Sequence, residues 1–354
     1  MNNHVTLNLR LRRRSERIAR LSGQQGSSGR AGMARSGSRR PSPRRECGGH
    51  WTHLHVLSVL ITLACAREPG VRGGGQDAEV PESHRRRDEL VYRQVGPRNL
   101  RLDVYLPHGT RPPFPTVLYL HGGGWTGGAK EEAVEAVGRL IDAGWAIVSP
   151  EYRVAPRDPA PAAVEDAVCS MRWLARHAAV YGFDLRRLLV AGYSAGGHLA
   201  LLLAFLPDSL SFGNNCVGEP TPRPTAVLNL AGVTDVGQLL EGPWRRDWAE
   251  AWAGVRPGRP DLASTLSPLT WIRPGVPPVV TVQGEADTVV PYAQAVRLHQ
   301  ALSEAGVPNR LCTARTEGHD LLGATETEAV TAAVARALVE RSESSRSSAI
   351  QAVC

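Results

Sequence analysis

The sequence predicts an α/β fold in which a mostly parallel sheet is covered by helices on both faces. From about residue 88 onward, short apolar runs alternate with helical patterns. Helices placed between strands serve as the crossover connections that parallel strands require. The chain of 354 residues is also 42% hydrophobic, which is enough apolar material for a large core and excludes wholesale disorder.

The predicted strands are short apolar runs rich in β-branched residues. The domain begins with a pair of strands, Leu90–Val95 and Leu100–Leu106. The later strands are Pro115–Leu120, Ala146–Ser149, Leu188–Ala191, Ala226–Leu230, Val279–Val282 and Asn309–Thr313. Helical patterns occur near residues 130–143, 160–180, 197–206, 291–305 and 324–341. One doubly wound domain over residues 88–342 accounts for this pattern.

Two stretches of the domain exceed normal loop lengths, residues 207–223 and 232–276. We expect both to form a partial cap over the carboxyl edge of the sheet. In the second stretch, Trp244, Trp248 and Trp252 recur every four residues, which places them on one face of a helix. They form either an aromatic wall for the substrate or the packing surface between cap and body, and we favour packing.

The positive charge of the chain is concentrated at its N-terminal end. Residues 1–50 hold 12 Arg against Glu16 and Glu46, a net charge of +10, so the total of +7 leaves −3 for residues 51–354. This arm is rich in Arg, Ser and Gly and has no apolar period, which is typical of an unfolded segment. Because the basic charge lies outside the predicted domain, the composition argues against a nucleic-acid-binding protein.

The arm leads into a signal-peptide-like segment, so that residues 1–66 form one predicted unit. Residues 54–66 are mostly apolar, too short to span a bilayer, and end in Ala-Cys-Ala, a cleavage pattern. We therefore expect secretion, with lipid attachment at Cys65 as the alternative and a cytoplasmic location if the segment is not a signal. The long arm favours Met33 over Met1 as the start. No apolar run reaches the roughly 18 residues of a membrane-spanning helix.

The remaining segments carry no recognisable motif. Residues 67–87 are polar and predict a linker, and the Ser-rich residues 343–354 predict a frayed tail. The six cysteines have no metal-type spacing, so neither a zinc site nor a dense disulfide framework is predicted. We predict no metal and no organic cofactor. The oligomeric state stays open, as does pairing among four of the cysteines, Cys169, Cys216, Cys312 and Cys354.

The strongest local motif is Gly192-Tyr193-Ser194-Ala195-Gly196, which lies between a predicted strand and a predicted helix. In a strand–turn–helix context, a Gly-x-Ser-x-Gly sequence forms a tight turn that lifts the serine off the strand, and the glycines clear the space around it. Ser194 is therefore the predicted nucleophile.

A second motif, His121-Gly122-Gly123-Gly124-Trp125, also follows a predicted strand. Consecutive glycines allow the backbone to turn its N–H groups toward a small volume, as an oxyanion hole requires. The predicted donors are the N–H groups of Gly123, Gly124 and Ala195. A phosphate-binding loop is the alternative, but the Lys-Ser/Thr pair of such loops does not follow.

A serine hydroxyl needs a base, and the base needs an acid that orients it. In the chain order of this arrangement, the acid and then the histidine follow the serine. Asp287 lies in a loop after a predicted strand, and His319 follows the next strand-like run. His319 is thus the predicted base and Asp287 the predicted acid, with Glu285 and Asp235 as alternative acids.

Five motifs occur together in one order: His121–Trp125, Tyr152-Arg153-Val154-Ala155-Pro156, Gly192–His198, Asp287–Pro291 and Gly318-His319. Over residues 88–340 the chain resembles the α/β-hydrolase esterases related to hormone-sensitive lipase, closest to the bacterial feruloyl and acetyl-xylan esterase branch. The resemblance implies the α/β-hydrolase fold and the same roles for the residues named above. Tyr193 replaces a common acidic residue, and Arg157 stands where an acidic residue often lies, so substrate preference stays open.

These observations predict a serine carboxylesterase that cleaves esters of small acyl groups through an acyl-enzyme. The ester is a small molecule or is attached to a polysaccharide, and Trp125 and Tyr193 are predicted to contact it. The alternatives are amide hydrolysis, since kynurenine-formamidase-like proteins share the glycine loop and the Ser-His-Asp residues, and a non-catalytic surface binding protein.

Overall fold

The computed structural model describes residues 84–207, 210, 212–217, 220–244, 246–254, 259–322, 325–339, 348–351 and 353–354. The predicted basic arm and signal-like segment lie outside these residues. The helices and strands are β1 (His84–Val95), β2 (Arg98–Pro107), β3 (Phe114–Leu120), η1 (Lys130–Glu132), α2 (Ala133–Val137), α3 (Arg139–Asp142), β4 (Ala146–Pro150), α4 (Ala162–Arg176), α5 (Ala178–Tyr181), β5 (Phe183–Tyr193), α6 (Ala195–Phe205), β6 (Ala226–Leu230), α7 (Val236–Glu241), α8 (Arg246–Ala253), α9 (Arg259–Thr265), η3 (Pro268–Trp271), β7 (Val279–Gly284), α10 (Tyr292–Glu304), β8 (Asn309–Ala314) and α11 (Thr325–Val339).

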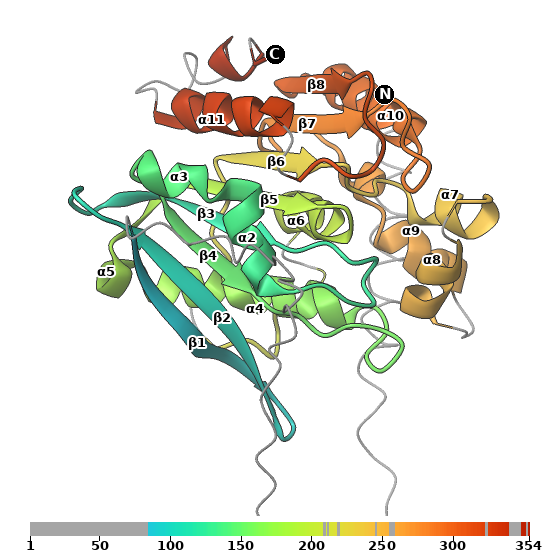
Figure 1. Ribbon diagram of the computed structural model, residues 1–354. Coiled ribbons are helices and arrows are strands. Elements are labelled where there is room, and N and C mark those ends of the chain that lie inside the picture. Colours follow the sequence, from blue (N-terminus) through green and yellow to red (C-terminus); the bar gives the residue numbers. More distant parts are fainter. Residues whose placement is uncertain are drawn as a thin grey trace, which may run out of the picture. The chain divides into compact units, whose positions relative to one another are not determined.

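The strands form one eight-stranded sheet in the order β1-β2-β4-β3-β5-β6-β7-β8 (Figure 1). The pairs β1–β2 and β2–β4 are antiparallel, and every pair from β4 to β8 is parallel. This topology is the α/β-hydrolase fold, as the sequence predicts. Because the central strands are parallel, the loops that follow β3, β5, β7 and β8 all emerge at the same edge of the sheet.

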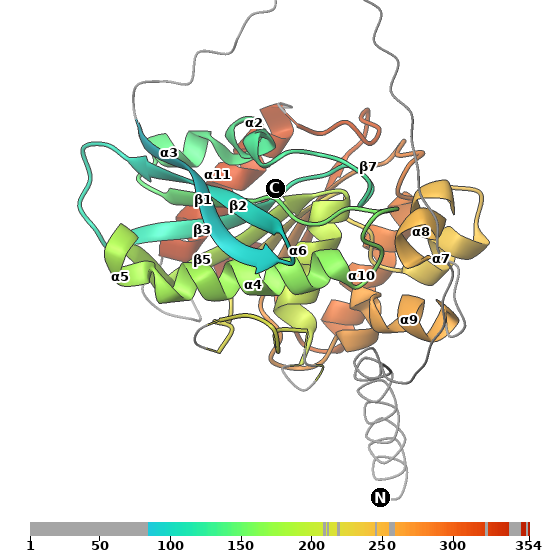
Figure 2. The ribbon, with the colours of Figure 1, turned by 90° about the horizontal axis from the view of Figure 1, so that it is seen from below.

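Helices cover both faces of the sheet (Figures 1 and 2). Side chains alternate along each strand, so one strand supplies both cores. In β3, for example, Leu118 and Leu120 belong to the core under α4, α6 and α10, whereas Val117 and Tyr119 belong to the core under α2, α3 and α11. Burial on both faces explains why the strands read as nearly continuous apolar runs.

The domain begins earlier than the sequence predicts. Strand β1 starts at His84, inside the predicted linker 67–87, and Arg86 and Arg87 pair with residues of β2. The guanidinium of Arg86 lies 2.9 Å from the buried carboxylate of Asp103. An Arg-rich run resembles a linker in composition, but here Arg86 lies in a strand and joins the buried Lys130 in pairing with the Asp103 carboxylate.

The two long insertions lie at opposite edges of the sheet. Residues 232–276 follow β6 and form α7, α8, α9 and η3 at the carboxyl edge, as expected of a cap. Residues 207–223 instead follow α6, which returns the chain to the amino edge. Their described part is bonded to α4 and lines a cavity together with the segment before β7. The prediction that both insertions join the cap is therefore corrected for residues 207–223.

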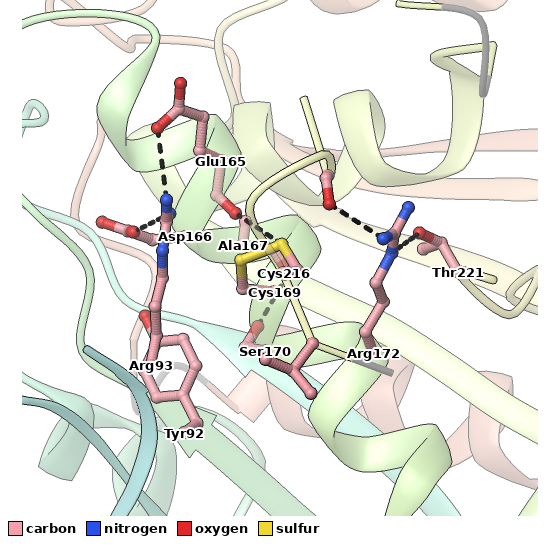
Figure 3. The surroundings of a disulfide bond; sticks show 12 residues. Tyr92, Arg93, Glu165, Asp166, Ala167, Cys169, Ser170, Arg172, Cys216 and Thr221 are labelled. Atoms are coloured by element: carbon pink, nitrogen blue, oxygen red, sulfur yellow. Dashed lines mark hydrogen bonds and ion pairs between the residues drawn. A yellow bond between two sulfur atoms is a disulfide. The ribbon is translucent and has the colours of Figure 1, made fainter. Parts of the chain in front are cut away.

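Two disulfides join four of the six cysteines. Cys169 of α4 is bonded to Cys216, and Arg172 of the same helix donates to Gly213 O at 2.8 Å and to Thr221 Oγ1 at 3.1 Å (Figure 3). These contacts hold the insertion of residues 207–223 against α4.

The second disulfide joins Cys312 of β8 to Cys354. Arg310 donates to the carbonyl oxygen of Val353 and to a main-chain oxygen of Cys354, and Val353 is buried. The prediction of a frayed tail over residues 343–354 is thus wrong for the described residues 348–351 and 353–354. In the part of the chain that the structure describes, no helix has the length and apolar character needed to cross a membrane.

Candidate active site

Ser194 lies at the sharp turn between β5 and α6. Its φ of 53° and ψ of −118° are rare for a residue other than glycine, which indicates a turn held by its surroundings. A Cβ atom on Gly192 would collide with the backbone of Gly196, and one on Gly196 would collide with Leu120 O. The turn therefore requires the Gly-x-Ser-x-Gly spacing seen in the sequence.

The imidazole of His319 lies between the side chains of Ser194 and Asp287. Its Nε2 atom is 2.9 Å from Ser194 Oγ, and its Nδ1 atom is 2.7 Å from Asp287 Oδ2. Because a carboxylate only accepts hydrogen bonds, Nδ1 carries the proton and Nε2 accepts from the serine hydroxyl. The structure thus brings together three residues that lie far apart in the sequence, each in a loop at the carboxyl edge of the sheet.

Four donors surround the carboxylate of Asp287. Oδ1 accepts the backbone N–H groups of Val289 at 2.8 Å and Val290 at 2.9 Å. Oδ2 accepts the side-chain amide of Gln283 at 2.7 Å in addition to the imidazole of His319. These bonds fix the orientation of the carboxylate and therefore that of the imidazole ring.

The alternative acids lie elsewhere. Glu285 is exposed to solvent, and so is Asp320, a further carboxylate next to His319 in the sequence. The Asp235 carboxylate caps the N-terminus of α7 through Gln238 N and forms an ion pair with Arg297 at 3.0 Å. None of the three carboxylates has a described hydrogen bond to His319, whereas Asp287 does.

The glycine loop after β3 is held in a tight turn. Gly123 and Gly124 have φ values of 104° and 60°, a region that favours glycine. The carbonyl of Gly123 accepts the N–H groups of Thr126 and Gly127. Glu132 closes the loop from the other side, because its carboxylate accepts the N–H groups of Gly122 and Ala129.

The start of the loop is fixed by two aromatic rings. Tyr152 donates to the carbonyl oxygen of His121 at 2.8 Å, and the two rings stack with centroids 4.1 Å apart. The Nδ1 atom of His121 lies 2.9 Å from Gly122 O, so His121 shapes the loop by hydrogen bonding. Burial lowers the pKa of His121 and raises the pKa of Tyr152, which keeps both groups uncharged.

The three predicted oxyanion donors differ in position. Among the residues that the structure describes, the N–H groups of Gly123, Gly124 and Ala195 donate to no protein acceptor. Gly124 and Ala195 line the same pocket as Ser194. Gly123 directly precedes Gly124 in the glycine loop but is not part of the pocket wall. The loop and the N-terminus of α6 therefore leave backbone donors available for a ligand oxygen near the serine.

The pocket beside Ser194 is small and apolar. Most of its wall is aliphatic or aromatic, and it is formed by Gly124, Trp125, Ser194, Ala195, Val233, Leu239, Trp248, Val289 and Val290. Leu239 belongs to α7 and Trp248 to α8, so the cap closes the pocket. The ring of Trp248 lies so close to Gly124 that a Cβ there would be 2.5 Å from it.

The tryptophans of the cap differ in their surroundings, and a role as a substrate wall stays a prediction. Trp252 is 1% exposed and stacks on Trp125 with ring centroids 4.4 Å apart, as packing predicts. Trp248 lines the pocket beside Ser194. Trp244 is 38% exposed. Trp125 also lines the pocket, although its indole N–H is directed away from solvent and donates to His198.

Tyr193 contacts the loop that carries His319. Its hydroxyl donates to the carbonyl oxygen of His319 at 2.8 Å, and its ring centroid is 5.2 Å from that of the imidazole. The ring also lies against Gly122, where an added Cβ would be 2.7 Å from it. Burial raises the pKa of Tyr193. The described contacts of its hydroxyl are thus to the protein, and contact with substrate stays a prediction.

Two supporting side chains are not evident from the sequence alone. Gln283 orients Asp287, and Glu132 closes the glycine loop. Gln283 is a polar residue directly after the apolar run Val279–Val282, which is only a weak sequence signal of its role. For the second, the spacing of Glu132 from Ala129 is the spacing of a capping box without its usual Ser or Thr.

The family model BD-FAE matches residues 102–302, a range that contains Ser194 and Asp287. Esterase LipQ of Mycobacterium tuberculosis is 28% identical over 242 residues, which cover 64% of this chain and 56% of that protein. Carboxylic ester hydrolase LipM of the same organism, described as probable, is 30% identical over 58% of this chain and 49% of its own length. The chain spans about half the length of these two relatives.

A solved structure of similar fold is esterase 2 of Thermogutta terrifontis with butyrate bound. It is 25% identical, has a TM-score of 0.57, and covers 68% of this chain and 86% of that one.

Proposed function

This chain belongs to the BD-FAE family, and from that premise we propose that it is a carboxylic ester hydrolase that uses Ser194, His319 and Asp287 as a catalytic triad. The observation that carries the proposal is the continuous hydrogen-bonded series from Ser194 Oγ through the imidazole to the Asp287 carboxylate. The related proteins named as esterases support the reaction type.

In the first half of the reaction, Ser194 Oγ attacks the acyl carbonyl carbon while His319 Nε2 accepts the hydroxyl proton. Asp287 stabilises the imidazolium that forms. The carbonyl oxygen becomes an oxyanion, which accepts hydrogen bonds from backbone N–H groups of Gly123, Gly124 and Ala195. The C–O bond to the alcohol then breaks, and the imidazolium returns its proton to the leaving alkoxide, so that an acyl-enzyme on Ser194 remains.

In the second half, water takes the place of the serine as nucleophile and attacks the acyl-enzyme, and Ser194 Oγ becomes the leaving group. His319 accepts a proton from the water, the oxyanion forms again in the same place, and the proton passes to Ser194 Oγ as the acid is released. Since Gln283 and two backbone N–H groups hold Asp287 throughout, the imidazole needs no reorientation between the halves.

The apolar pocket supports a small acyl group as the substrate. The pocket adjoins Ser194, and Leu239 and Trp248 are among its lining residues, so an acyl chain placed there would contact mostly apolar side chains. The structure of the Thermogutta esterase with butyrate bound is consistent with short acyl groups in this fold. The alcohol part, which is either a small molecule or a polysaccharide, lies outside the pocket and is not specified by it.

The test is hydrolysis of p-nitrophenyl acetate and butyrate by the wild type and by Ser194→Ala. We expect the variant to lose at least about 10³-fold in kcat while its circular dichroism spectrum stays unchanged. A parallel arm with N-formylkynurenine measures amide hydrolysis. Retention of wild-type ester turnover by Ser194→Ala would overturn the proposal. A kcat/KM of the wild type that is higher on N-formylkynurenine than on the esters would change the proposed substrate class from esters to amides.

We propose further that the protein acts outside the cytoplasm. Disulfides persist in oxidising compartments and are rare in reducing ones, and the described residues hold two, Cys169–Cys216 and Cys312–Cys354. The apolar segment ending in Ala-Cys-Ala favours the same location. Sequencing the N-terminus of the protein from its native host tests this: a chain that begins at Arg67 supports secretion, a lipidated Cys65 supports an anchored form, and a chain that retains residue 60 contradicts export.

A further inference from the structure

Trp125 adopts a backbone conformation that a bulky residue rarely adopts. Its φ is 57°, and it directly follows Gly123 and Gly124, whose φ values are also positive. Glycine adopts such angles freely, whereas a residue with a Cβ does so at a cost of about 1 kcal/mol or more and persists only where its surroundings hold it. The loop thus needs an external restraint at Trp125 to keep the two preceding N–H groups in place.

That restraint comes from contacts on both ends of the residue. The backbone carbonyl of Trp125 accepts the N–H of Ala155 at 2.8 Å. The indole N–H donates to His198 Nδ1 at 3.2 Å, and the indole ring stacks on Trp252 of the cap. All three rings are fully buried. The side chain therefore occupies one position, defined by α6 on one side and by α8 on the other.

His198 uses both of its ring nitrogens in this arrangement. Nδ1 accepts from Trp125, so Nε2 carries the proton and donates to Leu266 O at 2.7 Å. Leu266 follows α9 in the cap. Burial lowers the pKa of His198 to about 4, so the ring is neutral and keeps its acceptor at ordinary pH.

We propose that His198 is a positioning residue for the oxyanion hole: through its bond to the Trp125 indole it holds the Gly123 and Gly124 N–H groups toward the reacting oxygen, and through Leu266 it ties the cap to that loop. The inference rests on the proposed ester hydrolysis. His198 contacts neither substrate nor Ser194 Oγ in this account, and its effect on catalysis passes entirely through Trp125.

The test compares His198→Leu with His299→Leu. His299 is a matched control, since it is also buried, also has a pKa lowered by burial to about 4, and bonds to Asn309 away from the site. For His198→Leu we expect kcat on p-nitrophenyl acetate to fall about 10–100-fold with KM within about twofold, because removing one oxyanion donor costs about 10²–10³-fold. His299→Leu should retain wild-type kcat.

Two further measurements separate positioning from packing. An aryl trifluoromethyl ketone forms an adduct whose negative oxygen occupies the oxyanion hole, so its inhibition constant should rise in parallel with the loss of kcat in His198→Leu. Trp125→Phe keeps a ring on Trp252 but removes the indole N–H. In a double-mutant cycle, the pair Trp125→Phe and His198→Leu should cost no more than the larger single change, since both break one bond.

The proposal is overturned if His198→Leu retains kcat within about twofold of wild type, if His299→Leu loses as much, or if the two losses in the cycle are additive. Should His198→Leu fail to fold, Trp125→Phe alone decides: a lower kcat with unchanged KM supports the proposal, and an unchanged kcat overturns it. An inactive wild type would instead contradict ester hydrolysis itself.

Discussion

Replacing Trp248 by Ala should lengthen the acyl chain that the enzyme accepts. Trp248 forms part of the wall of the small pocket beside Ser194, together with Leu239 from the neighbouring cap helix. Removing the indole extends the apolar space between the cap and the glycine loop without touching Ser194, Asp287 or His319.

The magnitude follows from the burial of methylene groups. Each methylene that moves from water into an apolar pocket contributes about 0.8 kcal/mol, which is about fourfold in kcat/KM. If the vacated indole space admits roughly three more methylenes, the octanoate ester gains about 2.4 kcal/mol, or roughly 60-fold, relative to the acetate ester.

The assay measures kcat/KM on p-nitrophenyl acetate, butyrate, hexanoate and octanoate and compares the octanoate-to-acetate ratio between variants. This ratio is unaffected by a loss of kcat/KM common to all four esters, such as one that follows from removing the contact between Trp248 and Gly124. Trp244→Ala, which removes a tryptophan that is 38% exposed, is the control and should leave the profile unchanged. An octanoate-to-acetate ratio in Trp248→Ala equal to that of the wild type would refute the assignment of this pocket to the acyl chain.

Three further predictions concern two buried histidines and two residues next to the site. The buried histidines His198 and His299 have pKa values lowered to about 4 from 6.5, so the unfolded chain binds more protons between these values. The free energy of unfolding should therefore fall by roughly 2 kcal/mol per histidine between about pH 7 and about pH 5; urea denaturation that shows equal stability at both pH values contradicts this. Gln283→Leu removes one donor to the Asp287 carboxylate and should lower kcat about tenfold with little change in KM; a steady-state kcat equal to that of the wild type argues against this role. Tyr193→Phe frees the carbonyl of His319 and should lower kcat by several-fold, while unchanged turnover would limit Tyr193 to packing.

The sequence predicts which residues meet at the site because the loops that follow parallel strands all lie at the carboxyl edge of the sheet. Ser194, Asp287 and His319 each follow an apolar run, and the structure brings them within hydrogen-bonding distance of one another. The glycine loop is predicted for the same reason, since a Gly-rich segment after β3 opens at that edge. Local pattern and topology are sufficient for these positions.

Residues that act across the fold are not evident from local patterns. His198 looks like an ordinary residue of the helix that follows the elbow, and its partners Trp125 and Leu266 are 73 and 68 residues away in sequence. The two disulfides likewise join cysteines separated by 47 and 42 residues. Such pairings depend on the final path of the chain, which the spacing of single residues does not encode.

The placement of residues 207–223 shows a different kind of limit. Length and composition identify an insertion but not the edge of the sheet at which it lies. That edge depends on whether a helix or a strand precedes the insertion. The segment follows α6 and so lies at the amino edge, whereas the segment after β6 lies above the site.

Labelling with a fluorophosphonate probe, followed by peptide mass spectrometry, tests the central claim most directly. The account predicts that one equivalent of probe attaches to Ser194 in the wild type, and that His319→Ala reduces the labelling rate by at least about 10³-fold, because the serine loses its base. Labelling at another residue, or a folded protein whose Ser194 stays unlabelled, would contradict it.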